Sequence, residues 1–154
     1  MGRVLIRGAA AGAAGTTALN AMTYMDMVVR GRPASTTPSR TVEEVAARLG
    51  VPVPGSGPQR SNRVSALGAL GGLLTGVGSG AALAVVRATG PRRSPLAVGV
   101  IAVAGALLGG NGPMIALGVT DPRDWSAADW AADLIPHLAY GLVTGWVLDR
   151  LDRG

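Results

Sequence analysis

Acidic and imidazole side chains recur at four-residue intervals near the C-terminal end of the sequence. Asp133, His137 and Asp149 fall on one such register, and Gly141 and Gly145 fill the steps between them. On a continuous helix the Asp133 carboxylate could reach the His137 imidazole, an arrangement used for proton transfer and metal ligation. The chain has one histidine and no cysteine, which argues against a metal site of the usual kinds.

Pro136 lies inside this register and leaves two interpretations open. A proline removes a backbone donor and kinks or restarts a helix, so the four-residue register could break at this point. The preferred interpretation is that His137 is a structural residue that forms hydrogen bonds between helices, because polar groups inside a membrane face partners. If the register holds, Asp133 and His137 are candidates for proton transfer, and a lipid-modifying enzyme built on this pair is a further alternative.

A second group of polar residues lies near the N-terminus, where Asn20, Tyr24 and Asp26 interrupt a run of small side chains. The structural interpretation is that Asn20 bonds across to a neighbouring helix. The functional interpretation is a polar lining for a solute or proton path. Asp26 and Arg30 are spaced as an ordinary helical ion pair at a membrane interface.

The third candidate is Asn111, which lies within Gly-Gly-Asn-Gly-Pro at 109–113. This cluster should unwind or bend a helix, and the Asn111 amide would satisfy the backbone groups that are set free. Broken helices mark substrate sites in transporters. The sequence has no internal repeat that would supply a counterpart, so this signal is isolated.

Four apolar segments must position these residues. They cover about 4–29, 64–86, 95–119 and 131–148, and the first three are long enough to cross a hydrocarbon core of ~30 Å. The fourth reaches that length only by including Asp133, so a three-span arrangement with the last segment at the interface stays open. The sequence therefore predicts an all-α polytopic membrane protein, a bundle of four transmembrane helices forming a single membrane domain over 1–154.

Glycines at four-residue spacing indicate how these helices pack. In a soluble helix each glycine would cost about 1 kcal/mol against alanine, whereas in lipid the spacing cuts a groove that admits a neighbouring backbone. The predicted packing positions are Gly68, Gly72, Gly76 and Gly80 in the second segment and Gly141 and Gly145 in the last.

The long first loop, 30–63, contains a short amphipathic helix at 41–49. Thr41 and Glu44 have the form of a capping box, and Gly50 would end the helix. This helix is too short to be stable alone, so we expect it to rest on the membrane surface or against the ends of the other helices.

Composition narrows the classes of partner. All 14 basic residues are arginines, the net charge is +5, and aromatic residues make up only 3% of the chain. The arginines flank apolar runs and no stacking platform for bases exists, so the expected partner is the lipid bilayer rather than nucleic acid. A homo-oligomer or another membrane protein is a further possible partner, and no cofactor is expected.

The arginines also indicate an orientation. Half of them lie in the N-terminus, the connection near residue 90 and the C-terminal tail, and half lie in the two other loops. The first half is packed into shorter segments beside the apolar runs, where the positive-inside rule is strongest. This predicts a multi-pass protein with both termini in the cytoplasm.

Several stretches carry a resemblance. They are Tyr24-Met-Asp-Met, Arg30-Gly-Arg-Pro-Ala-Ser, the loop helix with Gly50, and Pro136-His-Leu-Ala-Tyr-Gly141. In these the chain resembles small four-helix inner-membrane proteins of bacteria, loosely of the YagU-like type, and more closely a set of actinobacterial membrane proteins. The resemblance implies the bacterial inner membrane and no established activity, so it assigns no functional residue.

The predicted function is a structural or accessory, non-enzymatic role in the membrane. The alternative is a small oligomeric transporter or channel for a small solute or protons, which would use Asn20, Tyr24, Asn111 and His137.

Overall fold

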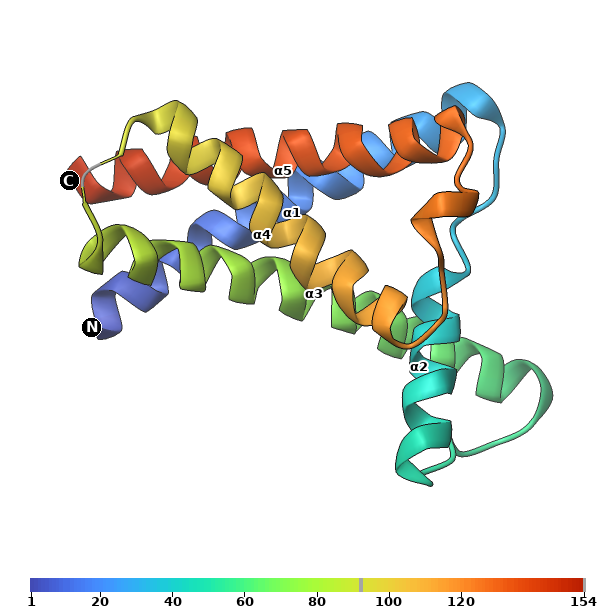
Figure 1. Ribbon diagram of the computed structural model, residues 1–154. Helices are drawn as coiled ribbons and strands as arrows, with labels where there is room; N and C mark the ends of the chain where they lie inside the picture. The colour runs from blue at the N-terminus through green and yellow to red at the C-terminus, as the bar shows by residue number, and fades with distance from the viewer. Residues whose placement is uncertain (92, 154) are drawn as a thin grey trace.

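The computed structural model describes residues 1–91 and 93–153, and in these ranges the chain forms five α-helices, one short 3-10 helix and no strand (Figure 1). The helices are α1 (Gly2–Arg30), α2 (Thr37–Leu49), α3 (Gly57–Thr89), α4 (Pro95–Ala116) and α5 (Ala127–Arg153), with η1 (Pro122–Asp124) before the last. The prediction of an all-α protein is confirmed.

The four long helices lie alongside one another, and α2 lies across one end of them (Figure 1). The central helix is α1, which packs most extensively against α3 and α5, while α4 crosses from α5 to α3. Both termini and the α3–α4 connection lie at the same end of the bundle. The opposite end holds α2 and η1.

Two of the four predicted spans are apolar enough to cross a membrane by length and composition, and the other two are not. The two are α3 and the Leu96–Ala116 part of α4. The helices α1 and α5 have sufficient length, but their glycine, threonine and charged residues lower the mean hydropathy below that of a typical span. Length and composition therefore support two of the four predicted spans, α3 and α4.

Several predicted boundaries are also corrected. The helix α2 begins at Thr37 rather than at 41, because Pro38 occupies its first turn, where a proline is preorganised for helix. Thr41 is not its cap, since the Thr41 hydroxyl donates to the Thr37 carbonyl at 2.8 Å. Gly50 ends the helix as predicted, with φ of 66°. The first seven residues of α3, 57–63, belong to the helix and not to the loop.

A capping box does occur, but at the start of α5. The Ser126 hydroxyl accepts from the Asp129 amide at 3.2 Å, and the Asp129 carboxylate accepts from the Ser126 amide at 2.9 Å. The Ser126 hydroxyl also donates to this carboxylate, at 2.6 Å. The hydrogen bond from the Ser126 hydroxyl is the largest cause of a lowered pKa at the exposed Asp129, and the hydrogen bond from the Ser126 amide is the next largest. The reciprocal pairing satisfies donors that the first turn of a helix leaves free.

Small residues form the contacts between the helices. A methyl group on Gly80 would lie 2.5 Å from the backbone of Gly12, and one on Gly76 would overlap the Thr16 hydroxyl. A methyl group on Gly68 would lie 3.0 Å from the backbone of Pro38 in α2. These three members of the glycine series therefore mark close contacts of α3 with α1 and α2.

The remaining predicted glycines divide into two groups. Gly141 packs against Val103 and the backbone of Gly99 in α4, and Gly145 is buried. Gly72 is exposed, and a methyl group added to it would contact nothing within 4 Å. Gly72 is therefore not a packing position within the chain, because α1 and α3 touch at Gly76 but no longer at the level of Gly72.

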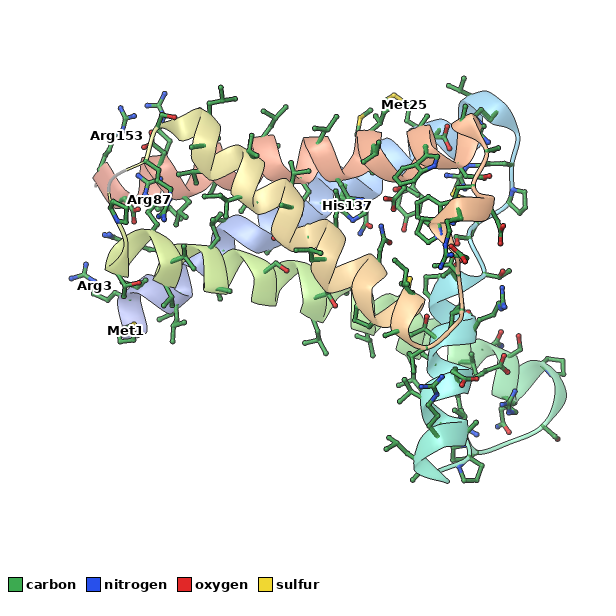
Figure 2. All side chains as sticks on the ribbon, viewed as in Figure 1. Met1, Arg3, Met25, Arg87, His137 and Arg153 are labelled. Atoms are coloured by element: carbon green, nitrogen blue, oxygen red, sulfur yellow. The ribbon has the colours of Figure 1, made fainter. Side chains whose placement is uncertain are left out.

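Charged side chains join three helices at the end that holds the termini. Arg87 of α3 donates to Asp149 and lies beside Asp152 of α5, both at 3.1 Å. Arg7 of α1 lies 3.7 Å from Asp152, and Arg153 pairs with Asp149. We refer to these five residues as the ionic latch, and Figure 2 shows Arg87 and Arg153 within it.

Candidate functional site

The structure brings together three of the predicted polar residues, Asn111 of α4 and Asp133 and His137 of α5. The Asn111 side-chain amide donates to the Asp133 carboxylate at 2.9 Å. His137 Nδ1 lies 2.7 Å from the backbone carbonyl of Asp133 and 3.5 Å from its carboxylate. The side chains of Asp133 and His137 are only 18% and 14% exposed, so the group is largely shielded. We call it the polar cluster.

The helix α5 holds this geometry because it runs without interruption through Pro136. The four-residue register from Asp133 to His137 therefore survives the proline, and the break that Pro136 could have caused is absent. The proline has no amide hydrogen to offer to the preceding turn. His137 Nδ1 lies at the carbonyl of Asp133, four residues before it.

The prediction of a broken helix at 109–113 is wrong, because α4 stays helical from Pro95 to Ala116 and includes Pro113. The Asn111 amide is consequently not used to satisfy freed backbone groups. It reaches across to Asp133 and joins α4 to α5. The glycines beside Asn111 instead leave room at the helix contact.

His137 presents its second ring nitrogen to α4. Nε2 lies 3.9 Å from the position that a methyl group on Gly110 would take, and Figure 2 shows the imidazole between α5 and α4. A residue with a side chain at 110 would approach the ring. Among the hydrogen bonds of the described chain none involves Nε2, so this nitrogen is available to a proton or another small donor.

The polar residues of α1 do not join the polar cluster. Tyr24 is 62% exposed, and Asn20 is partly buried without a hydrogen bond to Asn111, Asp133 or His137 in the described part of the chain. Asp26 lies 3.6 Å from Arg30, as its spacing predicts, and it also binds Arg32. Asp26 therefore belongs to an ion-pair network at the end of α1.

A buried polar layer that sequence analysis missed lies one turn beyond His137. The Tyr140 side chain is 1% exposed, and its hydroxyl donates to the Gly76 carbonyl of α3 at 2.7 Å. Thr144 is fully buried, and its hydroxyl lies where a methyl group on Gly15 of α1 would be. No local pattern in the sequence marks this layer, because the contact of Tyr140 with Gly76 joins residues 64 positions apart.

The side chains of the polar cluster can form hydrogen bonds and exchange protons. No group of three or more histidine, aspartate or glutamate side chains suited to a metal ion occurs among residues 1–91 and 93–153. One imidazole, one carboxylate and one amide can hold a single proton between α4 and α5. The two surface hollows lie elsewhere, one along Val53 and Leu67 and one around Thr120 and Asp121.

Comparison of the chain with protein-family models, with curated proteins and with solved structures finds no match. The functional argument consequently depends on the geometry of this chain alone.

Proposed function

We propose that this chain is an integral membrane protein in which α1, α3, α4 and α5 all cross the bilayer. The observation that carries the proposal is the distribution of side-chain size. Glycine, alanine and threonine make many of the contacts between the helices, together with a few larger buried side chains such as Leu83, Tyr140 and Leu148, while most of the exposed large apolar side chains lie on the outer faces. This is the arrangement expected where lipid, rather than water, surrounds a helix bundle.

Each long helix contributes to the apolar exterior. Examples are Ile6 of α1, Leu74 of α3, Leu108 of α4 and Leu142 of α5, all at 66% exposure or more. In α1 the buried residues are all small, namely Gly8, Ala11, Gly12, Gly15 and Thr16. A low mean hydropathy is therefore compatible with an apolar face towards lipid.

The tryptophans of α5 support a spanning position for this helix. Trp130 and Trp146 are both exposed and are separated by four and a half turns, or about 24 Å along the axis. Tryptophans favour the two interfaces of a bilayer, whose hydrocarbon core is ~30 Å thick. The separation fits a helix with one tryptophan near each interface.

The proposed location is the bacterial cytoplasmic membrane, with both termini in the cytoplasm. It is supported by the placement of the N-terminus, the α3–α4 connection and the C-terminus at one end, since these short segments hold half of the arginines. The long loop with α2 would then face the other side.

Single cysteines test this arrangement, because the native chain has no thiol. We expect Ser56→Cys, before α3, to react with an impermeant maleimide in intact cells, and Ser94→Cys, before α4, to react only after lysis. The opposite pattern would invert the orientation. Release of the protein from membranes by alkaline carbonate would contradict the membrane-spanning proposal itself.

The role that we propose is structural or accessory and not enzymatic, with a homo-oligomer or another membrane protein as the possible partner. Support comes from the buried polar layer, in which Tyr140 and Thr144 fill the space between α1, α3 and α5. A solute or proton path that entered the bundle and passed the polar cluster would be blocked by Tyr140 and Thr144 before it reached the end that holds the termini. The bundle interior therefore favours a helix-packing role over conduction.

The second candidate function is transport of protons or of a small solute, and the polar cluster favours it. To test it, the protein is placed in vesicles that contain a pH-sensitive dye, and wild type is compared with His137→Gln. Glutamine can replace one imidazole hydrogen bond but cannot exchange a proton near neutral pH. We expect both proteins to leak protons no faster than empty vesicles. A wild-type flux that disappears in a folded His137→Gln variant would establish proton transport instead.

A further inference from the structure

The charges of the chain are distributed unequally between the two halves of the bundle. The half that holds both termini contains six described arginines and only two aspartates, whereas the half that holds α2 and η1 contains seven arginines and seven acidic residues. The first set is Arg3, Arg7, Arg87, Arg93, Arg150 and Arg153 with Asp149 and Asp152. The second half is therefore neutral, and the first carries the positive excess.

The ionic latch uses only part of that positive charge. Its aspartates are occupied by Arg7, Arg87 and Arg153. In the described part of the chain no carboxylate lies within ion-pair distance of Arg3, Arg93 or Arg150, and all three side chains are exposed. Three cationic groups are thus left free at this end.

Two of these arginines, Arg3 and Arg150, lie beside an exposed apolar side chain. The Arg150 guanidinium lies over the ring of Trp146, 5.6 Å from its centre, and Trp146 is 62% exposed. Arg3 is less than one helical turn from Ile6, which is 71% exposed. A cation next to an apolar group matches a lipid, whose phosphate and acyl chain are joined in one molecule.

We propose that the end of the bundle formed by the start of α1 and the end of α5 binds the headgroups of anionic phospholipids through Arg3 and Arg150. This inference rests on the proposed membrane-spanning function and specifies the lipid that the protein prefers. A neutral headgroup lacks the net negative charge that the unpaired guanidinium groups attract. The neutral α2 half provides no such preference.

The test uses the full-length protein in dodecyl maltoside micelles, to which phosphatidylglycerol or phosphatidylcholine with the same acyl chains is added. The readout is the midpoint of thermal unfolding as a function of lipid concentration. We expect phosphatidylglycerol to raise the midpoint more than phosphatidylcholine does. Each of Arg3→Gln and Arg150→Gln should weaken the apparent affinity for phosphatidylglycerol about fivefold. This is the factor that corresponds to the ~1 kcal/mol contributed by one arginine near an anionic surface. Added salt should weaken it as well.

Arg40→Gln is the matched control, because Arg40 is exposed and has no ion-pair partner among the described residues but lies in α2. This variant should keep the wild-type response to phosphatidylglycerol. Equal effects of the two lipids, an equal loss in Arg40→Gln, or an equal response to inorganic phosphate alone would each overturn the inference. Retention of the protein in carbonate-washed membranes would show in those cases that the membrane-spanning proposal still holds.

Discussion

At the scale of single residues, the glycines of α3 differ in what surrounds them although their spacing is uniform. A methyl group on Gly76 would overlap Thr16 of α1, whereas one on Gly72 would contact nothing within 4 Å. Gly76 is therefore required by a helix contact. Gly72, one turn away, is not required by any contact in the described chain.

We expect Gly76→Leu to destabilise the protein and Gly72→Leu to leave its stability unchanged or slightly increased. Forcing a large side chain into a filled contact typically costs about 1–3 kcal/mol, while replacing an exposed helical glycine can gain up to about 1 kcal/mol. Thermal unfolding in detergent measures both variants. A loss of stability in Gly72→Leu comparable to that in Gly76→Leu would indicate that Gly72 faces a second copy of the chain.

Sequence reasoning found the three residues of the polar cluster and the pair Asp133 and His137, but not the hydrogen bond between Asn111 and Asp133. The four-residue step from Asp133 to His137 is a property of one helix and could be predicted once α5 was assumed to continue. The hydrogen bond from Asn111 to Asp133 depends on how α4 crosses α5, which no local pattern encodes. Tyr140 was missed for the same reason, because its partner Gly76 is 64 residues away.

At the scale of secondary-structure elements, the ionic latch joins the start of α1, the end of α3 and the end of α5. Its central acid is Asp149, whose pKa is lowered from the ordinary value for aspartate, chiefly by the hydrogen bond from Arg87 and further by Arg153. An unfolded aspartate titrates near a pKa of about 3.9. The latch therefore stabilises the fold at pH values above this and loses its effect as the pH falls through the lower pKa of the folded state.

The expected result is a fall in the unfolding temperature of the wild-type protein when the pH is lowered from neutral towards 3. Arg87→Gln should be less stable at neutral pH and should lose less on acidification, because the main cause of the lowered Asp149 pKa is gone. Arg123→Gln, at the other end of the bundle, should behave as wild type. Parallel acid profiles for wild type and Arg87→Gln would argue against a stabilising latch.

The elements also show why hydropathy and structure disagree for α1. This helix is central and contacts both α3 and α5, so Gly8, Gly12 and Gly15 occupy positions where a soluble protein would place leucine. Mean hydropathy averages the lipid-facing and helix-facing sides of a segment. The sequence could therefore predict helices and their approximate order, but not which of them are central.

At the scale of the whole molecule, small residues make many of the close helix contacts, and large apolar residues are exposed on every long helix. An exterior of this kind in water would be a large exposed apolar surface, which soluble monomers avoid. The helices α3 and α4 are long and apolar enough to span a membrane, and α1 and α5, which are less apolar, have exposed large apolar side chains as well. If the proposed membrane position is right, the bilayer accounts for the exposed large side chains on all four long helices.

The α5 helix provides the most direct test of this view, because its composition alone does not mark it as a span. Leu142 lies in its middle and is 66% exposed, so Leu142→Asp should keep every contact between the helices. If α5 faces lipid, an aspartate at the centre of the span costs about 2.5–3.5 kcal/mol, and less protein should resist alkaline carbonate extraction of the membranes. Leu49→Asp is the control, since Leu49 is 70% exposed at the end of α2, outside the proposed spans. Equal membrane retention of the two variants would place the middle of α5 in water and leave the chain with fewer than four spans.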